Sequence, residues 1–230
     1  QTADNRKPSL TTNLDKPYLS FDGSNDSLEA DLTGHILDDP TGKNVTIFTV
    51  VKPKQKSGES YILSTGGQTN SAVGYAFGTD EGVKGWSIFK DQNGGNTIQL
   101  SESFQTNQTH LVTHSYKTSF NEYEVLVNGS LETDLGLEYG GASNGHHFLT
   151  IGRPNNGNSY FGKFEIAEVI VISSTDAQKI MGIQYYLSKK WGLTTNVDSD
   201  GDGVSDLSDE TPAGLVTQPK QVEFEITYED

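Results

Sequence analysis

The sequence predicts an all-β protein, a sandwich or barrel of short strands, with one short helix near its C-terminal end. Three observations lead to this prediction. Short runs rich in β-branched and aromatic residues recur at roughly 8–12-residue spacing, with Gly, Pro, Asn and Asp between them. Two of these runs carry apolar side chains on both faces, which indicates strands that are covered on each side. Only one segment shows the periodicity of an amphipathic helix.

The strand predictions follow from where the turn signals fall. The run 45–51 ends at Pro53, which cannot donate a backbone hydrogen bond within a sheet. Asn128 and Gly129 form a two-residue hairpin turn, because both tolerate a positive φ. The runs 45–51 and 166–172 are the doubly apolar ones, so we expect them at the centre of the sandwich. The expected strands are 18–21, 45–51, 61–64, 75–77, 85–89, 97–100, 110–116, 123–127, 148–151 and 161–172.

The helix is predicted over residues 175–191. Thr175 followed by Gln178 fits a capping box, and Gly192 follows the last turn as a stop signal. We expect this helix to lie across the sandwich or to cap one end of it. Its apolar stripe consists of Ile180, Ile183, Leu187 and Trp191.

Composition excludes several classes of protein. The chain has 16 basic and 31 acidic residues, a net charge of −15, which disfavours nucleic acid as a partner because phosphate contacts need clustered Lys and Arg. No apolar run approaches the ~18 residues of a membrane span, so no membrane insertion is expected. The absence of Cys removes disulfides and thiol chemistry. Because Gln1 is not an initiator Met, we expect a processed product or a fragment.

The charge is uneven along the chain and suggests four segments. Residues 198–230 contain ten acidic residues and one Lys, whereas residues 1–197 contain 21 acidic and 15 basic residues. The alternation of apolar and acidic residues over 221–229 predicts a strand that either returns to the sandwich or, as we favour, opens a next module. The predicted segments are a lead-in at 1–16, the β-rich domain at 17–193, an acidic connector at 194–212, and a linker with a strand at 213–230.

The acidic connector contains the pattern of a twelve-residue calcium loop. Carboxylates fall at positions 1, 3, 5, 9 and 12, a Gly stands at position 6, and a backbone carbonyl serves position 7. The alternative is a solvated acidic linker, but the placement of the carboxylates favours Ca²⁺ with a structural role, stiffening the junction to the next module. Asp22 and Asp26 could hold a second calcium, although an Asx-capped turn is the preferred interpretation. The predicted ligands are Asp198, Asp200, Asp202, Val204, Asp206 and Asp209.

The order of several segments resembles a known family. These segments are FDGSNDSLEA, TIFTVVKP, YEVLVNGS, FLTIGR, FGKFEIAEVIVI and YYLSKKWGL. Together they resemble the bacterial laminin-G-like branch of the concanavalin A-like lectin/glucanase superfamily, over about residues 17–193. The resemblance implies a two-sheet antiparallel jelly-roll sandwich with a short helix near its end, in a secreted or surface protein. Many such modules bind carbohydrate or act in adhesion. It implies no fixed ligand residue. The acidic segment resembles thrombospondin type 3 repeats and dockerin-like loops, which also use Asp at position 12.

The sequence predicts that the chain is not an enzyme. Glucanases of this superfamily carry Glu-x-Asp-x-Glu or Glu-x-Asp-x-x-Glu on one central strand, and this pattern is missing here. Glu165 and Glu168 lie three residues apart, which puts them on opposite faces of a regular strand. Glu122 and Glu124 share a face, but they are read as exposed strand charges near a hairpin end.

A sugar site combines an aromatic platform with planar polar groups, and loops at one end of a jelly roll supply such groups. Each candidate has a simpler alternative, since the aromatics could pack in the core and Arg153 could form a structural pair with a buried carboxylate. The candidate ligand contacts are Trp86, Tyr75, Asp80, His146, His147, Arg153, Asn155, Asn156 and Tyr160, with Asn144 beside the His pair.

These observations lead to one prediction of function and two alternatives. We expect a non-catalytic carbohydrate-binding or adhesive module of a larger secreted or cell-surface protein. Its partners would be a polysaccharide or glycoconjugate and further domains of the same polypeptide. The alternatives are a ligand-free spacer in a giant adhesin or filament, and an unusual glycoside hydrolase or polysaccharide lyase. An exposed aromatic-lined surface would favour binding, whereas paired carboxylates with a raised pKa would favour the enzyme.

Overall fold

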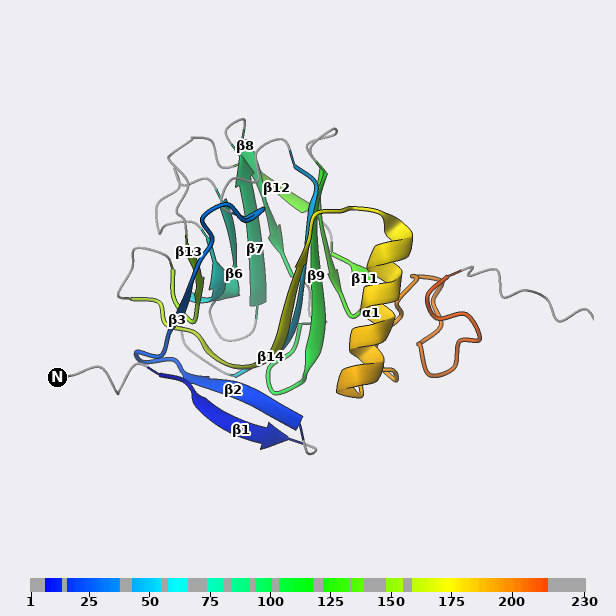
Figure 1. The fold of residues 1–230 in the computed structure, drawn as a ribbon, viewed down its shortest axis with the longest axis horizontal. Coiled ribbons are helices and arrows are strands. Elements are labelled where there is room, and N and C mark those ends of the chain that lie inside the picture. The colour runs from blue at the N-terminus through cyan, green and yellow to red at the C-terminus, as the bar shows by residue number, and fades with distance from the viewer. Residues whose placement is uncertain are drawn as a thin grey trace, which may run out of the picture.

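Two seven-stranded antiparallel sheets pack face to face, as the family resemblance implies (Figure 1). The structure is a computed structural model. It describes residues 7–13, 16–37, 43–54, 58–65, 74–80, 84–91, 94–100, 104–117, 122–132, 134–138, 148–154 and 159–214. The predicted strand at 221–229 therefore lies outside the described residues.

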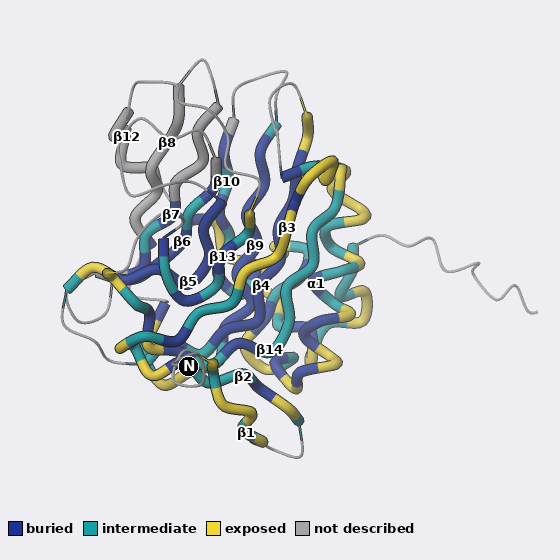
Figure 2. Tube along the Cα trace, turned by 60° about the vertical axis from the view of Figure 1, so that its left-hand side comes forward, coloured by how far each residue is buried: buried dark blue, intermediate teal, exposed yellow. Residues whose placement is uncertain are grey.

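The first sheet carries the helix on its outer face, and we call it the helix-side sheet. The two strands with continuous apolar runs, β14 and β4, lie inside it, as expected, and β4 is buried along nearly all of its length (Figure 2). Its strands in spatial order are β1 (Ser9–Asn13), β2 (Lys16–Asp22), β14 (Lys163–Ile172), β4 (Val45–Pro53), β9 (His110–Lys117), β10 (Glu122–Val127) and β11 (Ser130–Leu131).

The second sheet, which we call the opposite sheet, closes the sandwich. It contains two strands that the sequence did not predict, the first and the last of its spatial order. Both are short and contain only two apolar residues each, so their alternation is too brief to mark a strand. Its strands in spatial order are β12 (Asp134–Glu138), β8 (Gly94–Gln99), β7 (Lys84–Asp91), β6 (Gly74–Asp80), β5 (Ser60–Ser64), β13 (Phe148–Ile151) and β3 (Leu28–Asp31).

Apolar side chains form two cores. The larger core lies between the sheets, where the rings of Phe21 and Phe164 stack with centroids 4.5 Å apart. The smaller core lies between the helix-side sheet and the helix α1 (Ala177–Trp191), where Phe48 and Leu187 are buried. Burying side chains on both faces of the helix-side sheet explains why its central strands lack apolar–polar alternation.

Helix α1 begins one residue later than the capping-box prediction. Asp176 is the N-cap, and its carboxylate accepts a hydrogen bond of 2.9 Å from the backbone N–H of Lys179. Asp at this position satisfies a free amide and suits the positive end of the helix dipole. The helix ends as predicted at Gly192, which adopts the left-handed conformation with φ 71°. Within the described residues, no helix has the length and apolar character needed to cross a membrane.

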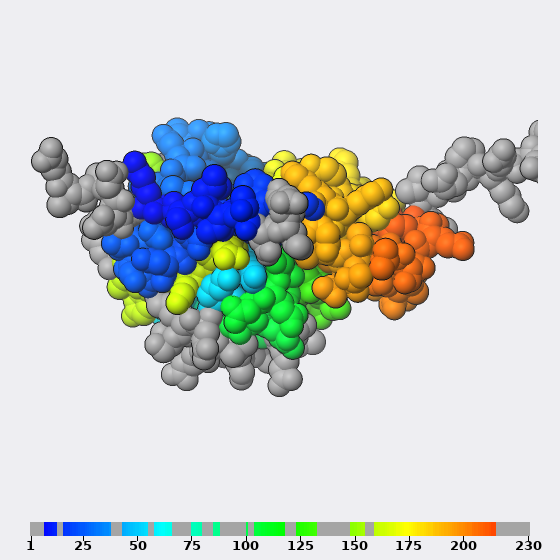
Figure 3. Space-filling model, turned by 90° about the horizontal axis from the view of Figure 1, so that it is seen from below, coloured from blue at the N-terminus to red at the C-terminus, as the bar shows by residue number. Residues whose placement is uncertain are grey.

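The acidic segment that follows α1 packs beside the helix. Figure 3 shows it next to α1 at one end of the described surface, away from the β1–β2 hairpin. Val197 is fully buried in the smaller core, so the chain is anchored where the aspartates begin.

Candidate functional site

Three aromatic side chains meet on the outer surface of the opposite sheet. Tyr61 on β5 pairs with Gly78 on β6, and Gly78 pairs with Trp86 on β7. The rings of Tyr61 and Trp86 meet edge to face with centroids 4.8 Å apart. We call Tyr61, Trp86 and Tyr160 the aromatic row.

Glycine at position 78 lets the two rings meet. A Cβ there would lie 2.0 Å from the carbonyl oxygen of Ser60 and 2.7 Å from an indole carbon of Trp86. The side chain of Trp86 faces outward, because its neighbours Gly85 and Ser87 face the core. A glycine inside a strand often marks such a close approach.

The third ring comes from the segment that precedes β14. Tyr160 is 43% exposed, and its ring centroid lies 6.4 Å from that of Tyr61. Its carbonyl accepts a 3.0 Å hydrogen bond from the backbone N–H of Tyr61. Its φ is +59°, a left-handed conformation that costs a non-glycine residue roughly 1–2 kcal/mol. Strain of this kind is concentrated at functional sites.

The hydroxyl of Tyr61 and the indole N–H of Trp86 are both largely shielded from water. Burial, followed by the neighbouring carboxylate of Glu59, raises the pKa of the Tyr61 hydroxyl, which therefore stays protonated at neutral pH. The indole N–H of Trp86 is buried and has no hydrogen-bond partner. The row thus combines an exposed ring, a partly buried indole and a neutral hydroxyl.

The other predicted ligand contacts take different places. Tyr75 is a correction to the sequence analysis, because only 1% of it is exposed and its ring packs in the core against His114. Arg153 forms an ion pair, as the alternative interpretation expected, and also donates to the carbonyl of Pro154; its partner Glu29 is 47% exposed rather than buried. The backbone of Asp80 ends β6, and its side chain is outside the description. Asn144, His146, His147, Asn155 and Asn156 lie outside the described residues.

A buried polar cluster lies directly beneath the row. Ser87 contacts the Nδ1 atom of His114 at 3.0 Å and also the hydroxyl of Tyr123, which lies 3.2 Å from the same nitrogen. Burial lowers the pKa of His114 to about 3. The three side chains are enclosed between the sheets, so a substrate could not reach them.

The glutamates of β14 correct one detail of the sequence analysis. A β-bulge between Ile166 and Glu168 shifts the register, so Glu168 shares the helix side of the sheet with Glu165 instead of lying on the opposite face. On the helix side, the oxygens of Glu168 accept from Lys190 and from the indole N–H of Trp191, at 2.9 and 2.7 Å. Glu165 pairs with Lys54 at 3.0 Å. Both carboxylates are therefore committed to structural contacts.

The acidic loop brings three of its predicted calcium ligands together. Oxygens of Asp198, Asp200 and Asp202 all lie within 4.8 Å of one another. Asp198 accepts hydrogen bonds of 2.8 Å from the amides of Gly201 and Gly203, both of which have positive φ. Burial raises the pKa of Asp200, and repulsion from the neighbouring aspartates adds to the shift.

The remaining predicted ligands divide between two roles. Asp206 is buried and accepts from the amide and hydroxyl of Ser199, at 2.8 and 2.9 Å, and from the hydroxyl of Ser188 on α1. Asp209 keeps one carboxylate oxygen buried without a partner, and its charge acts on Asp200. Val204 is 40% exposed.

Asp22 and Asp26 form the expected Asx-capped turn, with Asp22 accepting from the amide of Ser24 at 2.7 Å.

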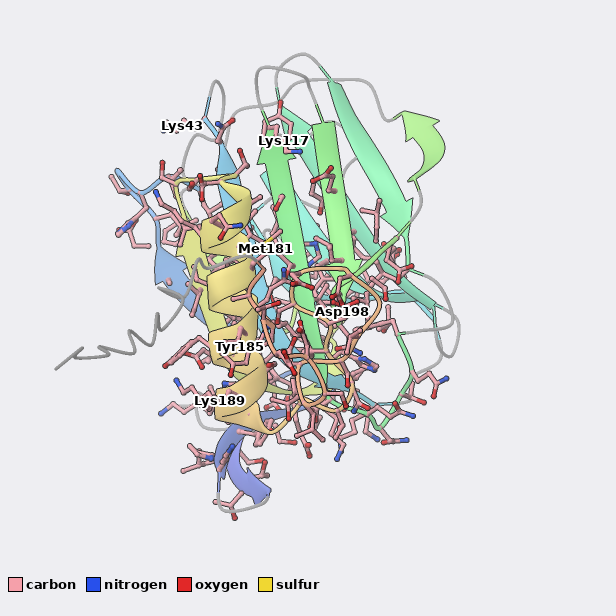
Figure 4. All side chains as sticks on the ribbon, turned by 90° about the vertical axis from the view of Figure 1, so that its right-hand side faces the viewer. Lys43, Lys117, Met181, Tyr185, Lys189 and Asp198 are labelled. Carbon is pink, nitrogen blue, oxygen red and sulfur yellow. The ribbon has the colours of Figure 1, made fainter. Side chains whose placement is uncertain are left out.

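The loop rests on the β10–β11 turn and on α1. The amide of Asp198 donates 3.1 Å to the carbonyl of Asn128, and Gln184 donates 3.2 Å to the carbonyl of Ser199. A Cβ on Gly129 would lie 1.6 Å from the carbonyl oxygen of Asp198, so only glycine permits this contact. Figure 4 shows the loop of Asp198 beside α1.

Solved structures share this fold at low sequence identity. The receptor-binding domain of botulinum neurotoxin D is 16% identical with a TM-score of 0.53, covering 76% of this chain and 44% of that chain. A botulinum neurotoxin type C structure, whose cell entry is described as dependent upon interaction with two ganglioside molecules, is 13% identical with a TM-score of 0.56, covering 79% and 45%. The CBM40 domain of a Ruminococcus gnavus sialidase, bound to α2,3-sialyllactose, is 12% identical with a TM-score of 0.50, covering 68% and 89%.

This chain spans less than half the length of those toxin chains. No curated protein matches it. A laminin G family profile, described as the concanavalin A-like lectin/glucanases superfamily, matches residues 22–178, which is more than half of the chain. The chain belongs to the concanavalin A-like lectin/glucanases superfamily.

Proposed function

We propose that this domain is a non-catalytic module that binds glycans or glycoconjugates through the aromatic row. The main support for this proposal is that Trp86 and the exposed Tyr160, 74 positions apart in sequence, both lie against the ring of Tyr61 on one surface. Aromatic faces pack against the apolar faces of sugar rings, and neighbouring polar groups fix the orientation. The ganglioside and sialyllactose named for the structural neighbours agree with this ligand class.

The environment of the carboxylates favours binding over hydrolysis. Glycoside hydrolysis needs one carboxylic acid that can donate a proton and a second carboxylate beside the bond. Glu165 and Glu168 instead accept from cationic groups, and Glu168 also accepts from an indole. Both carboxylates are therefore engaged in structural contacts rather than placed beside a scissile bond.

A glycan array followed by titration of the best ligand tests the proposal. Tyr160→Ala and Trp86→Ala should each weaken binding by about tenfold, the equivalent of ~1.4 kcal/mol from a lost aromatic contact. Phe148→Ala is the matched control for Tyr160→Ala, because Phe148 is 44% exposed and Tyr160 is 43% exposed, but Phe148 lies outside the row. An array without any saturable ligand would contradict glycan binding and favour the ligand-free spacer.

We also propose that Ca²⁺ binds the acidic loop. The carboxylates of Asp198, Asp200 and Asp202 already lie close together. Asp209 has a carboxylate oxygen without a hydrogen-bond partner, and its charge acts on Asp200. Five carboxylates in so short a loop repel one another, and a divalent cation would remove that repulsion. Asp206 stands at position 9, from which such loops often reach the ion through water.

The role proposed for the ion is mechanical. A filled loop, seated on Asn128 and α1, would stiffen the junction between the sandwich and further domains of a larger secreted or surface protein. Loops of this type in extracellular modules bind Ca²⁺ with dissociation constants of about 10⁻⁴–10⁻³ M, which suits the extracellular medium.

Calorimetric titration with Ca²⁺, and limited proteolysis with and without chelator, test the calcium site. Calcium should bind more tightly than Mg²⁺ and should protect residues 198–210 from cleavage. Asp202→Asn should weaken calcium binding, whereas Glu210→Gln removes an adjacent exposed charge and should not. Unchanged cleavage in saturating calcium would refute the proposal.

A further inference from the structure

The outward face of α1 carries a charge opposite to that of the chain. The helix contains three lysines and no acidic residue, although the chain has a net charge of −15. Lys179, Lys189 and Lys190 are all exposed. Among the residues that the structure describes, Lys179 and Lys189 form no ion pair with a carboxylate, so their charges are not compensated by a direct partner.

Helix stability accounts for only part of this pattern. Lys189 and Lys190 lie in the last turn, where the helix dipole favours positive charge. Lys179 lies in the first turn, where the same dipole favours a negative side chain. An acidic residue at position 179 would stabilise the helix better, so the position of Lys179 calls for another reason.

Gly182 is a second residue of α1 that helix stability does not explain. A glycine inside a helix costs about 1 kcal/mol relative to alanine. A Cβ at this position would meet nothing within 4 Å, so packing against neighbours does not require the glycine. Its consequence is an open surface in the middle of the lysine face.

Two shallow hollows meet at this glycine. One has a volume of about 490 Å³ and lies toward the end of β14, and the other has a volume of about 390 Å³ and lies toward the C-terminal end of the helix. Both are lined by Gly182, and we call the surface that they form along the helix from Lys179 to Lys190 the α1 groove. At 1.5 Å per residue the groove is roughly 16 Å long. Its main lining residues are Lys179, Gly182, Tyr185, Tyr186, Lys189 and Lys190.

The tyrosines hold the C-terminal lysines in place. The ammonium of Lys189 lies 5.7 Å from the ring centroid of Tyr185, and that of Lys190 lies 5.3 Å from that of Tyr186. Tyr186 is 52% exposed. Figure 4 shows Tyr185 and Lys189 following one another along the helix. Such pairs reduce the side-chain freedom that a ligand would otherwise have to restrict.

The acidic loop does not line this groove. It contacts the other flank of α1, through Ser188 and Gln184, which are buried. Two described carboxylates contact residues of the groove: Glu168 pairs with Lys190, and Asp176 accepts from the backbone N–H of Lys179. The groove therefore presents positive charge on a helix whose other flank faces the acidic loop.

We propose that the α1 groove binds an anionic polysaccharide, as a second site separate from the aromatic row. The lysines would pair with carboxylate or sulfate groups along the chain, and the exposed ring of Tyr186 would contact a sugar face. Charge complementarity selects a polyanion, and the groove's length suits an extended chain. This inference does not rest on the function proposed for the aromatic row.

Titration of the full chain with polygalacturonate, dextran sulfate and neutral dextran tests the inference. We expect saturable binding to at least one of the two polyanions, weakening as salt is added, and none to dextran. Lys179→Gln combined with Lys189→Gln should reduce affinity by about tenfold, because each exposed ion pair is worth up to roughly fivefold. Trp86→Ala should leave this binding unchanged, which separates it from the glycan site.

A charge-matched variant controls for the general effect of removing two lysines. Lys52→Gln combined with Lys54→Gln removes the same charge near Glu165 and should change affinity by less than about twofold. An equal loss in both double variants, or equal binding of neutral dextran, would overturn the proposal. Absence of polyanion binding at low salt would overturn it too, as would preferential binding to phosphatidylserine vesicles through the same lysines.

Discussion

The buried imidazole of His114 should make the domain less stable in acid. Its ring lies between the sheets, where it contacts Ser87, Tyr123 and the ring of Tyr75. Its Nε2 atom is buried without a partner, so a proton there would be neither solvated nor hydrogen-bonded in the folded state. The perturbation is acidification from neutral pH to about pH 4.5.

The size of the effect follows from the difference between two pKa values. The unfolded chain binds this proton with the ordinary pKa of 6.5, whereas burial lowers the folded-state pKa to about 3. Between these values the unfolded state binds more protons, so stability falls as the pH falls. At 1.36 kcal/mol per unit, acidification to about pH 4.5 should remove roughly 2.7 kcal/mol from the free energy of unfolding.

Urea unfolding at several pH values, in chelator, measures this loss. His114→Gln keeps a polar side chain for Ser87 but cannot titrate, so its stability should depend less on pH. The buried His110, whose pKa is also lowered by burial, and the carboxylates contribute equally to both proteins and cancel in the difference. Parallel pH profiles for the two proteins, or an NMR titration of His114 near pH 6.5, would refute the reasoning.

Three further substitutions test other contacts. Gly78→Ala should destabilise the fold by about 2 kcal/mol in urea, and should alter Trp86 fluorescence, because the new methyl group overlaps a carbonyl and the indole. Asp206→Ala should cost about 3 kcal/mol, since it leaves the buried groups of Ser199 and Ser188 without their acceptor; a melting temperature equal to the parent's would count against this. Tyr160→Gly should leave stability within about 1 kcal/mol, because relief of the left-handed strain offsets the added chain entropy, yet it should lower glycan affinity as Tyr160→Ala does.

The sequence predicted the elements whose patterns are strong and local. The unbroken apolar run of β4 indicated a strand covered on both faces, and the apolar stripe with Gly192 located α1. The strand β3 escaped prediction because only Leu28 of its residues packs on the core. The β14 bulge could not be read from the sequence either, so the prediction that Glu165 and Glu168 lie on opposite faces was wrong.

The candidate site depends on register, which spacing alone does not determine. The sequence singled out Trp86 and Tyr160 separately, but their meeting needs the pairing of Tyr61 with Gly78 and of Gly78 with Trp86. Tyr61 was read only as a strand residue. The available signal was Gly78 itself, because a glycine within a strand pattern can indicate a close approach. Calcium binding at the acidic loop stays a prediction.

The packing of the acidic segment against α1 and its sheet indicates that the folding unit extends beyond the helix. The family profile stops at residue 178, near the start of α1, but Leu193 and Val197 complete the smaller core with Phe48 and Leu111. A truncation after the helix would strip these two side chains and open an apolar surface of the kind that drives aggregation. Any recombination that moves this domain intact must therefore carry the acidic segment with it, whether or not a cation is bound there.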